Sequence, residues 1–315
     1  MSGPQQVNAT PPEAGAETAG PPGEGGRFRI AVLIACHNRR EMTLACLDAL
    51  RNQEPVSGVT TEVYLVDDGS TDGTAGAVRR RYPDVVLFQG DGTLYWCGGM
   101  RAAFSEAVKG DYDGYWWLND DTFLHPRAMR VLLETRRRLL AATGREGIVV
   151  GSTCDPDTGE LTYGGKVRIR PGNPLACRAF RPADEPLPCD VFNGNCVLVP
   201  RAVARELGNL SGEYTHLIGD IDYGLRAAEK GIPCWVAPGY LAVCRGHPTP
   251  EWALPGLSLA ERLKRLHSPK GPPPREWRIF VRRHGGSRWV LHCAKLYLRA
   301  LAPRIYDRLK RLSPA

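Results

Sequence analysis

Short apolar runs that alternate with amphipathic helical patterns are the feature that most constrains the fold of this chain. The runs at residues 28–36, 62–66, 85–88, 115–118 and 148–151 are rich in β-branched or aromatic residues. Runs of this kind are typical of strands that are covered on both faces of a sheet. With helical patterns between them, they predict an α/β fold with a Rossmann-like, mostly parallel sheet flanked by helices.

Composition divides the chain into three parts. Residues 1–26 hold five prolines, six glycines and no aromatic residue, so we expect them to be disordered. Residues 251–315 hold 15 Lys and Arg against 4 Asp and Glu, whereas residues 1–250 hold 26 against 30. We therefore expect a main domain over residues 27–250 and a basic amphipathic helical extension over residues 251–315.

The basic extension suggests two kinds of partner. Leucines recur at helical spacing among Arg and Lys over residues 257–312. Such helices can rest on an anionic membrane surface. An equal alternative is a helical subdomain packed on the body or on a second subunit, so a homodimer stays open. No recognisable nucleic-acid-binding module accompanies the basic charge, and we expect no nucleic acid partner.

Cysteine usage and hydropathy indicate the compartment. The ten cysteines include no CxxC pair, and several lie inside apolar runs, so we expect buried, reduced thiols. The N-terminus has no basic start followed by an apolar core, and no apolar run approaches the roughly 18 residues of a membrane span. We expect a cytoplasmic protein, with peripheral attachment at the inner face of the plasma membrane left open.

Polar or acidic clusters follow the predicted strands or open a predicted helix. One cluster alone could be a turn or a helix cap. Several at the carboxyl edge of one sheet indicate a ligand site, and adjacent carboxylates there favour a hard divalent cation such as Mg²⁺ or Mn²⁺. The clusters are His37-Asn38, Asp67-Asp68, Asn119-Asp120-Asp121 and Gly219-Asp220-Ile221-Asp222.

These clusters resemble the motifs of the inverting family 2 glycosyltransferases of the GT-A fold. The resemblance spans roughly residues 28–247 and is closest to the rhamnosyltransferase-type members that build bacterial polysaccharides. The matching segments are Ala35-Cys36-His37-Asn38-Arg39, Val66-Asp67-Asp68-Gly69-Ser70-Thr71-Asp72, Leu118-Asn119-Asp120-Asp121 and Gly219-Asp220-Ile221-Asp222-Tyr223-Gly224-Leu225-Arg226.

The resemblance implies a donor site for a nucleotide-diphosphate sugar. Asp67 and Asp68 match acids that hold the base and the ribose, for which carboxylate acceptors are suited. His37 and Asn38 match the start of the same pocket. The family also places donor-sugar contacts in the region that follows residues 85–88, where this chain has the two candidates Trp96 and Gly99. A place in the core is an equal alternative for Trp96.

The resemblance also implies a divalent cation, Mg²⁺ or Mn²⁺, at the diphosphate. The run Asn119-Asp120-Asp121 matches the family's DxD motif, with Asp121 as the metal ligand and Asn119 and Asp120 on the nucleotide-sugar side. Asn119 stands where the family usually has its first Asp. His247 lies where many GT-A enzymes place a late histidine on the metal, although a lone histidine is as often structural.

The catalytic base implied by the resemblance is Asp220. It must remove the proton of a sugar hydroxyl, which is a poor nucleophile at neutral pH. Gly219 replaces the Glu that usually precedes this base in the family. We place Asp222 and Arg226, which match the rest of the motif, on the acceptor side, where they orient the helix or the acceptor. The same side receives Asn193 and Asn195, which interrupt a predicted strand and could also form a simple bulge.

The resemblance thus implies a metal-dependent, hexosyltransferase-type, inverting glycosyltransferase of cell-surface polysaccharide or glycolipid synthesis. Its acceptor would be a saccharide or a lipid-linked saccharide. A sugar nucleotidyltransferase is disfavoured because no glycine-rich loop follows residues 28–36. The remaining alternative is a catalytically degenerate protein that binds a nucleotide-sugar or lipid carrier, which the departures at Asn119 and Gly219 would suit.

Overall fold

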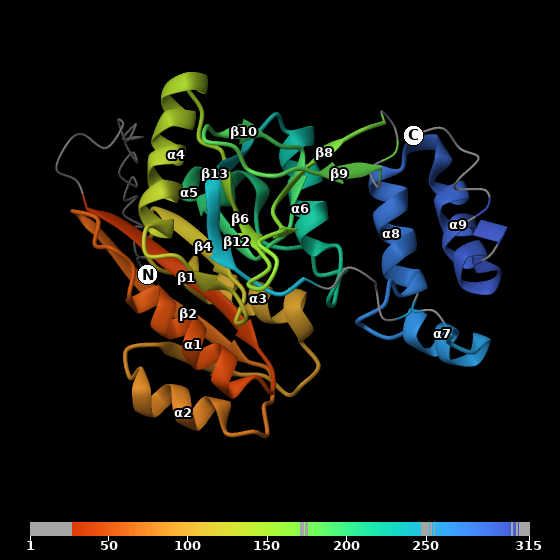
Figure 1. Ribbon diagram of the computed structural model, residues 1–315, viewed down its shortest axis with the longest axis horizontal. Helices are drawn as coiled ribbons and strands as arrows, with labels where there is room; N and C mark the ends of the chain where they lie inside the picture. The colour runs from red at the N-terminus through yellow and green to blue at the C-terminus, as the bar shows by residue number, and fades with distance from the viewer. Residues whose placement is uncertain are drawn as a thin grey trace, which may run out of the picture.

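The structure is a computed structural model, and it shows an α/β body with a group of C-terminal helices at one end (Figure 1). It describes residues 27–170, 173, 176–246, 252, 254, 256–303, 305–306 and 308. The segment expected to be disordered, residues 1–26, lies outside the described residues, as does His247.

The body is organised around one mixed sheet. Four neighbouring strands run parallel: β3 (Val86–Gln89), β2 (Val59–Asp67), β1 (Phe28–Cys36) and β4 (Gly114–Leu118). The sheet continues beyond β4 with β12 (Cys196–Pro200), β6 (Ile148–Cys154), β13 (Cys234–Val243) and β10 (Leu187–Pro188). Because β12 is antiparallel to both of its neighbours, β6 and its parallel partner β13 point the same way as β4.

Short strands complete the body. β5 (Phe123–Leu124) pairs with β13, and β7 (Leu161–Tyr163) pairs with β6. A second, small sheet contains β11 (Val191–Phe192), β8 (Gly165–Arg168) and β9 (Cys177–Ala179). The predicted mostly parallel α/β sheet is therefore confirmed, with antiparallel pairing added in its second half.

Helices cover both faces of the sheet, as the continuous apolar strands require. Alternate side chains of β1 point to opposite faces, so Ile30, Val32 and Ile34 join one apolar core and Ala31, Leu33 and Ala35 join the other. The first core is covered by α1 (Arg40–Arg51), α2 (Thr74–Arg81) and α4 (Ala128–Thr143). The second is covered by α3 (Tyr95–Ala107), α5 (Arg201–Leu207) and α6 (Gly219–Glu229).

The Gly164-Gly165 pair within residues 161–169 predicts a hairpin from the sequence. This prediction is wrong. β7 pairs with the central sheet, whereas β8 pairs with β9 and β11. The glycines permit close packing instead of a tight turn: a Cβ at Gly165 would lie 2.2 Å from Cγ2 of Val236 and 3.0 Å from Cβ of Cys189.

Two expectations drawn from composition can be checked against the fold. All ten cysteines lie in described residues, and none of them forms a disulfide, in agreement with the expected reduced thiols. In the part of the chain that the structure describes, no helix has the length and apolar character needed to cross a membrane.

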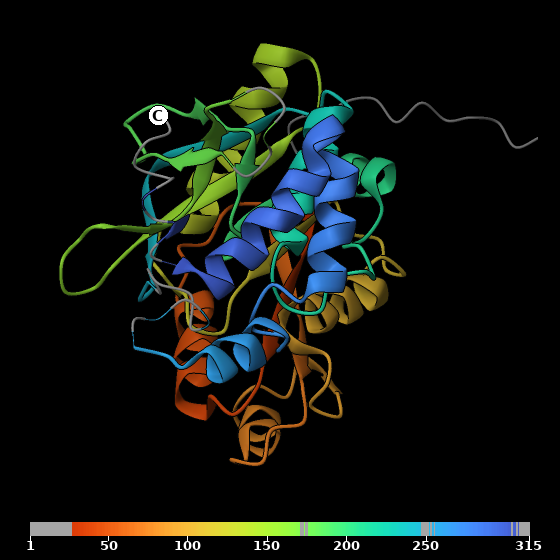
Figure 2. The same cartoon turned by 90° about the vertical axis from the view of Figure 1, so that its right-hand side faces the viewer.

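The C-terminal helices pack against the body beside α6 and form the end of the molecule that faces the viewer in Figure 2. They are α7 (Leu259–Leu266), α8 (Pro274–His284) and α9 (Trp289–Leu301), with the 3₁₀ turn η2 (Gly286–Arg288) between the last two. Phe280 and Val281 of α8 are fully buried in an apolar cluster with Leu225 of α6.

A buried carboxylate fixes α8 to α6. Asp222, in the first turn of α6, is fully buried and accepts hydrogen bonds from Nε of Arg226 at 2.9 Å and from the Tyr214 hydroxyl at 3.1 Å. From α8, Nη1 of Arg283 lies 2.7 Å and Nε2 of His284 lies 2.9 Å from Oδ1 of the same carboxylate. Four partners therefore stabilise the negative charge of Asp222, which burial alone would disfavour.

These partners decide the protonation state of Asp222. Burial by itself would raise the pKa of this carboxyl, but the hydrogen bond with His284 and the charges of Arg226 and Arg283 outweigh it and lower the pKa to about 2. Because the folded pKa lies below the ordinary value of about 3.9, the ionised carboxylate stabilises the fold above about pH 4. That contribution is lost as the pH falls towards about 2.

Asp222→Asn should lower the free energy of unfolding by roughly 3–5 kcal/mol at neutral pH, because it leaves two partly buried arginines and a buried histidine without their anion. Urea unfolding of both proteins measures the difference, which should shrink as the pH is lowered from about 4 towards 2. Glu134→Gln, on the exposed side of α4, removes the same charge and is the control. A deficit that does not change with pH, or equal stability of the two variants, would contradict this account.

Candidate active site

The topology brings the polar strand ends to one edge of the sheet. β1, β2 and β4 are parallel, so His37, Asp67 and Asn119 lie where these strands end. The antiparallel strand β12 pairs its first residue with the last residue of β4, so the turn before it reaches the same edge. There the backbone N–H of Asn119 donates to the carbonyl of Asn195 at 3.1 Å.

His37 and Asn38 join the ends of β1 and β2. Asn38 has a φ of 50°, a left-handed conformation that Asn tolerates better than most residues. Its side-chain oxygen accepts the backbone N–H of Thr71 at 2.7 Å, and its own N–H donates to the Ser70 hydroxyl at 2.8 Å. Nδ1 of His37 lies 2.5 Å from the carbonyl oxygen of Asp68. Both side chains are therefore placed beside the second acidic cluster.

Asp67 and Asp68 differ in how their carboxylates are used. Asp68 is 3% exposed, and its two oxygens accept backbone N–H groups of Gly92 at 2.9 Å and Tyr95 at 2.8 Å. It therefore shapes the loop between β3 and α3. Asp67 accepts only the N–H of Ser70 through Oδ1, at 3.0 Å, and its buried Oδ2 has no hydrogen-bond partner among the described residues. A buried oxygen without a donor is an available acceptor for a ligand.

Asp120 and Asp121 share one arginine. Nη1 of Arg39, the residue before α1, lies 3.2 Å from Oδ1 of Asp120 and 2.7 Å from Oδ2 of Asp121. Burial raises the pKa of Asp120 to about 7; the charge of Arg39 opposes the rise, and that of Asp121 adds to it. The thiol of Cys244 lies 3.6 Å from the other oxygen of Asp121. Burial, with the Asp121 charge, raises the pKa of Cys244 to about 12, so this group is a neutral donor.

Trp96 connects three segments of the edge. Its indole N–H donates to the side-chain oxygen of Asn119 at 2.7 Å. A Cβ at Gly194 would lie 2.5 Å from the Trp96 ring, so only glycine allows this contact. The side-chain oxygen of Asn119 therefore has a defined partner within the protein. Gly99, the other residue expected on the donor side, packs α3 onto β1, because a Cβ there would lie 2.7 Å from Cβ of Ala35.

Asp220 lies at the start of α6 and faces the same turn. Its carboxylate accepts the N–H of Gly194 at 3.0 Å and that of Ile221 at 2.8 Å. Burial raises its pKa above the ordinary value, while the charge of Lys166, these two N–H groups and the Asn193 side chain oppose the rise. A half-buried carboxylate with a raised pKa is a better proton acceptor than an exposed one.

The backbone around Asp220 is unusual. Ile218, which precedes the helix, has a φ of 71°, a conformation that costs a β-branched residue on the order of 1–3 kcal/mol. Strain of this kind is concentrated at functional sites. The next residue is Gly219, where a Cβ would lie 2.5 Å from Sγ of Cys97. Cys97 of α3 therefore occupies the space that the side chain of the family's usual Glu would need.

Not all of the expected acceptor-side residues lie at this edge. Asn193 contacts Asp220, and Asn195, 6% exposed, donates to Sγ of Cys244 at 3.8 Å, so the structure brings both to the site. Asp222 points instead into the buried cluster with α8 described above. Arg226 also donates to the carbonyls of Leu207 and Asn209, at 2.8 and 3.0 Å, and so holds the segment between α5 and α6.

Two residues that contact the acidic pair, Arg39 and Cys244, carry no role predicted from the sequence. Arg39 directly follows the His37-Asn38 pair, and an arginine beside a strand-end motif that faces two acids is a signal that could have identified it. Cys244 lies three residues before His247, but nothing in the sequence relates it to Asp121, whose contact depends on the packing of β13 beside β5 and β6.

The acidic pair fits a hard cation that is shared with a substrate. Among the described residues, no group of three or more His, Cys, Asp and Glu side chains could hold a metal ion by itself. Asp121 offers carboxylate oxygens, and the buried Oδ2 of Asp120 has no partner in the described part of the chain. Mg²⁺ is commonly bound by one or two carboxylates together with phosphates and water. The expected second ligand, His247, lies outside the described residues.

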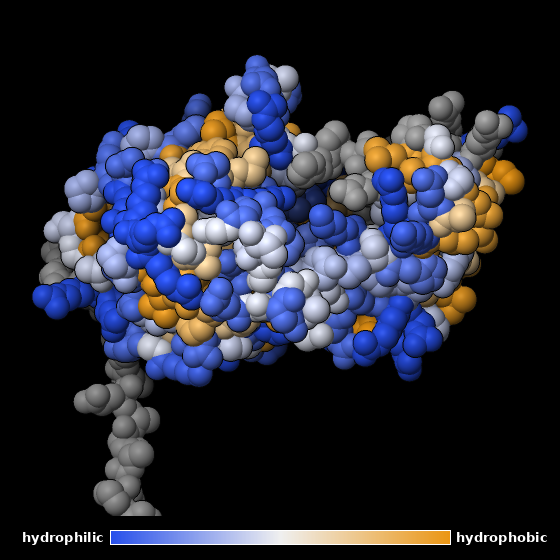
Figure 3. Space-filling view, turned by 90° about the horizontal axis from the view of Figure 1, so that it is seen from below, coloured by the Kyte–Doolittle hydropathy of each residue, from blue (hydrophilic) through white to orange (hydrophobic). Residues whose placement is uncertain are grey.

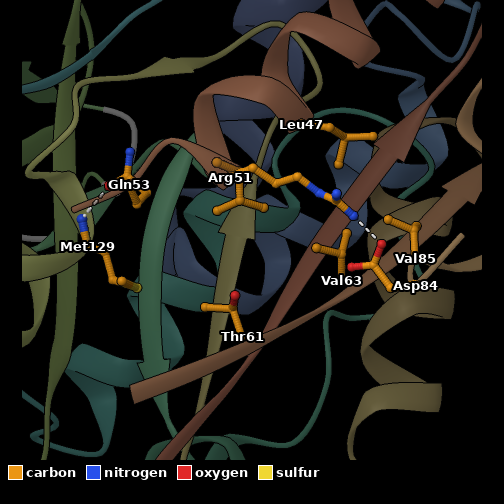
Figure 4. Close-up of a pocket in the computed structure, with 9 residues that line it drawn as sticks. Leu47, Arg51, Gln53, Thr61, Val63, Asp84, Val85 and Met129 are labelled. Carbon is orange, nitrogen blue, oxygen red and sulfur yellow. Dashed lines mark hydrogen bonds and ion pairs between the residues drawn. The ribbon is translucent and has the colours of Figure 1, made fainter. Parts of the chain in front are cut away.

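A separate pocket of about 230 Å³ carries no feature of this site (Figure 4). It lies between the end of α1 and the first half of β2, towards the opposite edge of the sheet, and Arg51 pairs with Asp84 at its rim. It is smaller than the roughly 300–1,000 Å³ of typical ligand pockets. Its lining residues are Leu47, Leu50, Arg51, Gln53, Thr61, Val63, Asp84, Val85 and Met129.

The chain is similar in sequence to known proteins. Residues 31–170 match the sequence model of the family described as glycosyl transferase family 2. Two relatives, from the CDC 1551 / Oshkosh and ATCC 25618 / H37Rv strains of Mycobacterium tuberculosis, are both named N-acetylglucosaminyl-diphospho-decaprenol L-rhamnosyltransferase. Each is 28% identical over 225 residues, which cover 64% of this chain and 70% of the relative.

A solved structure shares the fold. The mannosyltransferase PcManGT from Pyrobaculum calidifontis, in complex with GDP-Man and Mn²⁺, matches with a TM-score of 0.51 at 16% identity. The match covers 91% of this chain and 80% of that chain. The family match includes the strand ends at His37, Asp67 and Asp121. The expected fold and family resemblance are therefore confirmed: the chain has the GT-A fold, its residues 31–170 match glycosyl transferase family 2, and it is similar to rhamnosyltransferases.

Proposed function

We propose that this enzyme transfers a sugar, with inversion, from a nucleotide-diphosphate sugar to an acceptor hydroxyl. The observation that carries the proposal is the position of Asp220. It lies on a strained helix start, is half buried, has a raised pKa, and is joined through Gly194 and Trp96 to the acidic strand ends. A proton acceptor and a diphosphate site at one sheet edge suit a single displacement at a sugar carbon.

The donor's nucleoside is proposed to bind at the ends of β1 and β2. Oδ2 of Asp67 is the available acceptor for a donor group of the base or ribose. Asp68 contributes by fixing the loop that precedes α3, because its carboxylate is already hydrogen-bonded to that loop. His37 and Asn38 complete this part of the pocket. Trp96 is proposed to shape the floor under the donor sugar through its contact with Asn119.

The diphosphate is proposed to lie over Asp120 and Asp121. Asp121, with His247 as the expected second ligand, would hold a Mg²⁺ or Mn²⁺ ion. When bound, that ion supplies positive charge that stabilises the departing diphosphate. Arg39 serves as the counter-ion of the two carboxylates. We propose that Arg39 turns to the diphosphate when the donor binds, because one guanidinium can pair with phosphate as well as with carboxylate.

Asp220 is proposed to act as the general base. It takes the proton from the acceptor hydroxyl as that oxygen forms a bond to the anomeric carbon. The bond from this carbon to the diphosphate oxygen breaks on the opposite side, which inverts the configuration. The hydrogen bonds from Gly194 and Ile221 hold the carboxylate in one orientation for this step.

The relatives suggest the substrates. Their name describes transfer of L-rhamnose to an N-acetylglucosamine that is linked through a diphosphate to decaprenol. We propose a substrate pair of the same class for this chain, a nucleotide-activated deoxyhexose and a polyprenyl-diphosphate-linked saccharide, with a role in cell-surface polymer synthesis. A saccharide without a lipid carrier is the alternative acceptor.

A degenerate protein that binds nucleotide-sugar without turnover is the second candidate function. The two departures that suggested it each have a packing partner: Asn119 is hydrogen-bonded to Trp96, and Gly219 fits against Cys97. Matched substitutions of this kind favour a maintained site over a decayed one. Formation of product from a panel of nucleotide sugars separates the two functions.

Asp220→Asn should reduce kcat by roughly 10²–10⁴-fold, the usual contribution of a general base. Donor affinity should change little, because Asp220 lies on the acceptor side of the site. Because burial raises the pKa of Asp220, the acidic limb of the wild-type rate profile should lie above the range of an ordinary Asp, and the variant should lack it.

Asp184→Asn is the control for this substitution, since Asp184 is exposed and lies outside the site. Near-native turnover of Asp220→Asn, or an equal loss in the control, would refute the role of the base. If Asp220→Asn lost donor affinity by the same factor as it lost rate, Asp220 would be assigned to donor binding and not to the role of base.

Arg39→Gln and Asp121→Asn should change metal binding in opposite directions. Without nucleotide, Arg39→Gln should raise the affinity for Mn²⁺ by roughly tenfold, because a competing charge-assisted pair is removed. With Mn²⁺ present, the same variant should bind nucleoside diphosphates more weakly. Asp121→Asn should make nucleotide binding independent of Mn²⁺. Isothermal titration with Mn²⁺ and with a panel of nucleoside diphosphates measures both effects.

Arg40→Gln is the matched control, because Arg40 is the next residue, carries the same charge and pairs only with the exposed Glu41 among the described side chains. If Arg40→Gln reproduced the effect of Arg39→Gln, a general loss of positive charge would explain it. If Arg39→Gln left Mn²⁺ binding unchanged, Arg39 would not be the counter-ion that the cation replaces.

A further inference from the structure

The outer face of α9 carries large apolar side chains that are exposed to solvent. Nine large apolar side chains are exposed in the described part of the chain, and six of them lie between residues 257 and 308. The exposed fractions are 55% for Val290, 58% for Leu291, 41% for Tyr297 and 55% for Leu301. A helix at the surface of a soluble protein normally presents polar side chains outward.

The inner face of α9 is already used. His292, Leu296 and Ala300 are buried and recur at a spacing of four residues, so they form one stripe. This stripe faces α7 and α8: the Trp277 indole N–H donates to the carbonyl of His292, and Arg262 donates to that of Ala300. The apolar outer face is therefore additional to the packing that holds the helix in place.

Basic side chains border the apolar face. On α9, Lys295 and Arg299 follow one another at i and i+4 along the side of the helix, and Arg288 precedes them in η2. Residues 251–315 together hold 15 Lys and Arg against 4 Asp and Glu. In Figure 3, apolar and hydrophilic side chains lie side by side at the end of the molecule that these helices form.

The positive charge around this face favours an anionic partner. A second copy of the chain would bring a surface with the same strong positive charge against it, and like charges oppose such a contact. An anionic bilayer offers the opposite charge together with an apolar interior for the exposed leucines. The described helices are too short and too polar to cross a bilayer, so they would lie in its interface.

We propose that the face formed by Val290, Leu291, Tyr297 and Leu301, here called the α9 face, docks on an anionic lipid membrane. Its apolar side chains enter the region between headgroups and acyl chains, and the exposed Arg288 and Lys295 contact anionic headgroups. The docking itself is independent of catalysis. Its use, delivery of the site to a lipid-linked acceptor, rests on the proposed function.

The α9 face is mechanically connected to the candidate base. α9 packs on α8, and α8 is fixed to α6 by the buried Asp222 cluster. Glu276 of α8 also accepts the N–H of Thr215 at 3.2 Å and its hydroxyl at 2.7 Å, just before α6 begins. Docking would therefore set the orientation of α6, and with it Asp220, relative to the membrane.

Sedimentation of the full chain with lipid vesicles tests the proposal. The wild type should bind vesicles of phosphatidylcholine mixed with phosphatidylglycerol, and salt should weaken this binding. It should bind vesicles of phosphatidylcholine alone far less. The double variant Leu291→Gln/Leu301→Gln should lower the affinity for the mixed vesicles by about tenfold or more. Lys295→Glu with Arg288→Glu should lower it by a similar factor.

Val108→Gln is the matched control, since Val108 is 48% exposed at the end of α3 and lies outside the α9 face. Circular dichroism checks that each variant is folded, and the changed side chains are exposed, so unfolding is not expected. Asp220→Asn should bind vesicles as the wild type does, which separates failure of the docking from failure of the proposed catalysis.

Three outcomes would overturn the proposal. The first is that the wild type does not bind the mixed vesicles. The second is that the double variant binds them as well as Val108→Gln does. The third is that light scattering shows a wild-type dimer that Leu291→Gln/Leu301→Gln dissociates, which would assign the α9 face to a second copy of the chain.

Discussion

The antiparallel pairing of β4 with β12 is the constraint on which the candidate site depends. A sheet with only parallel strands would place the amino end of its next strand at the opposite edge. The reversed direction of β12 instead brings the turn at Gly194 to the carboxyl end of β4. Gly194 then contacts both the Trp96 ring and the carboxylate of Asp220. One reversal of direction therefore joins the proposed diphosphate site, built on the parallel half, to the proposed base on α6.

Buried carboxylates set the second constraint, because each must find a positive charge or several hydrogen-bond donors. Asp222 has its complete set within the protein, and its pKa is low. Among the described residues Asp120 has only the charge of Arg39 as a cationic partner, and its pKa is raised to about 7. This contrast distinguishes a structural carboxylate from one whose environment is incomplete. A cation and a diphosphate at Asp120 and Asp121 would complete it, which is the physical reason for assigning that pair to the leaving group.

Much of this could be predicted from the sequence, since it follows from local patterns. Apolar runs identified the parallel strands, and acids at their ends identified the edge. What could not be predicted depends on partners that lie far apart in the chain. The partners of Asp222 include Arg283 and His284, some 60 residues later, so its motif position suggested the acceptor side. The Gly164-Gly165 pair resembled a turn because the neighbours that require glycine, Val236 and Ser152, come from other strands.

The start of α6 connects the two ends of the molecule. Asp220 and Asp222 are two residues apart, which places them about 200° apart around a helix. One carboxylate therefore faces the sheet edge while the other faces α8. A rotation or shift of α6 that moved Asp220 would also separate Asp222 from Arg283 and His284, and breaking such a buried pair costs roughly 3–5 kcal/mol. The orientation of the candidate base is thus coupled to the packing of α8, and through α8 to the exposed face of α9.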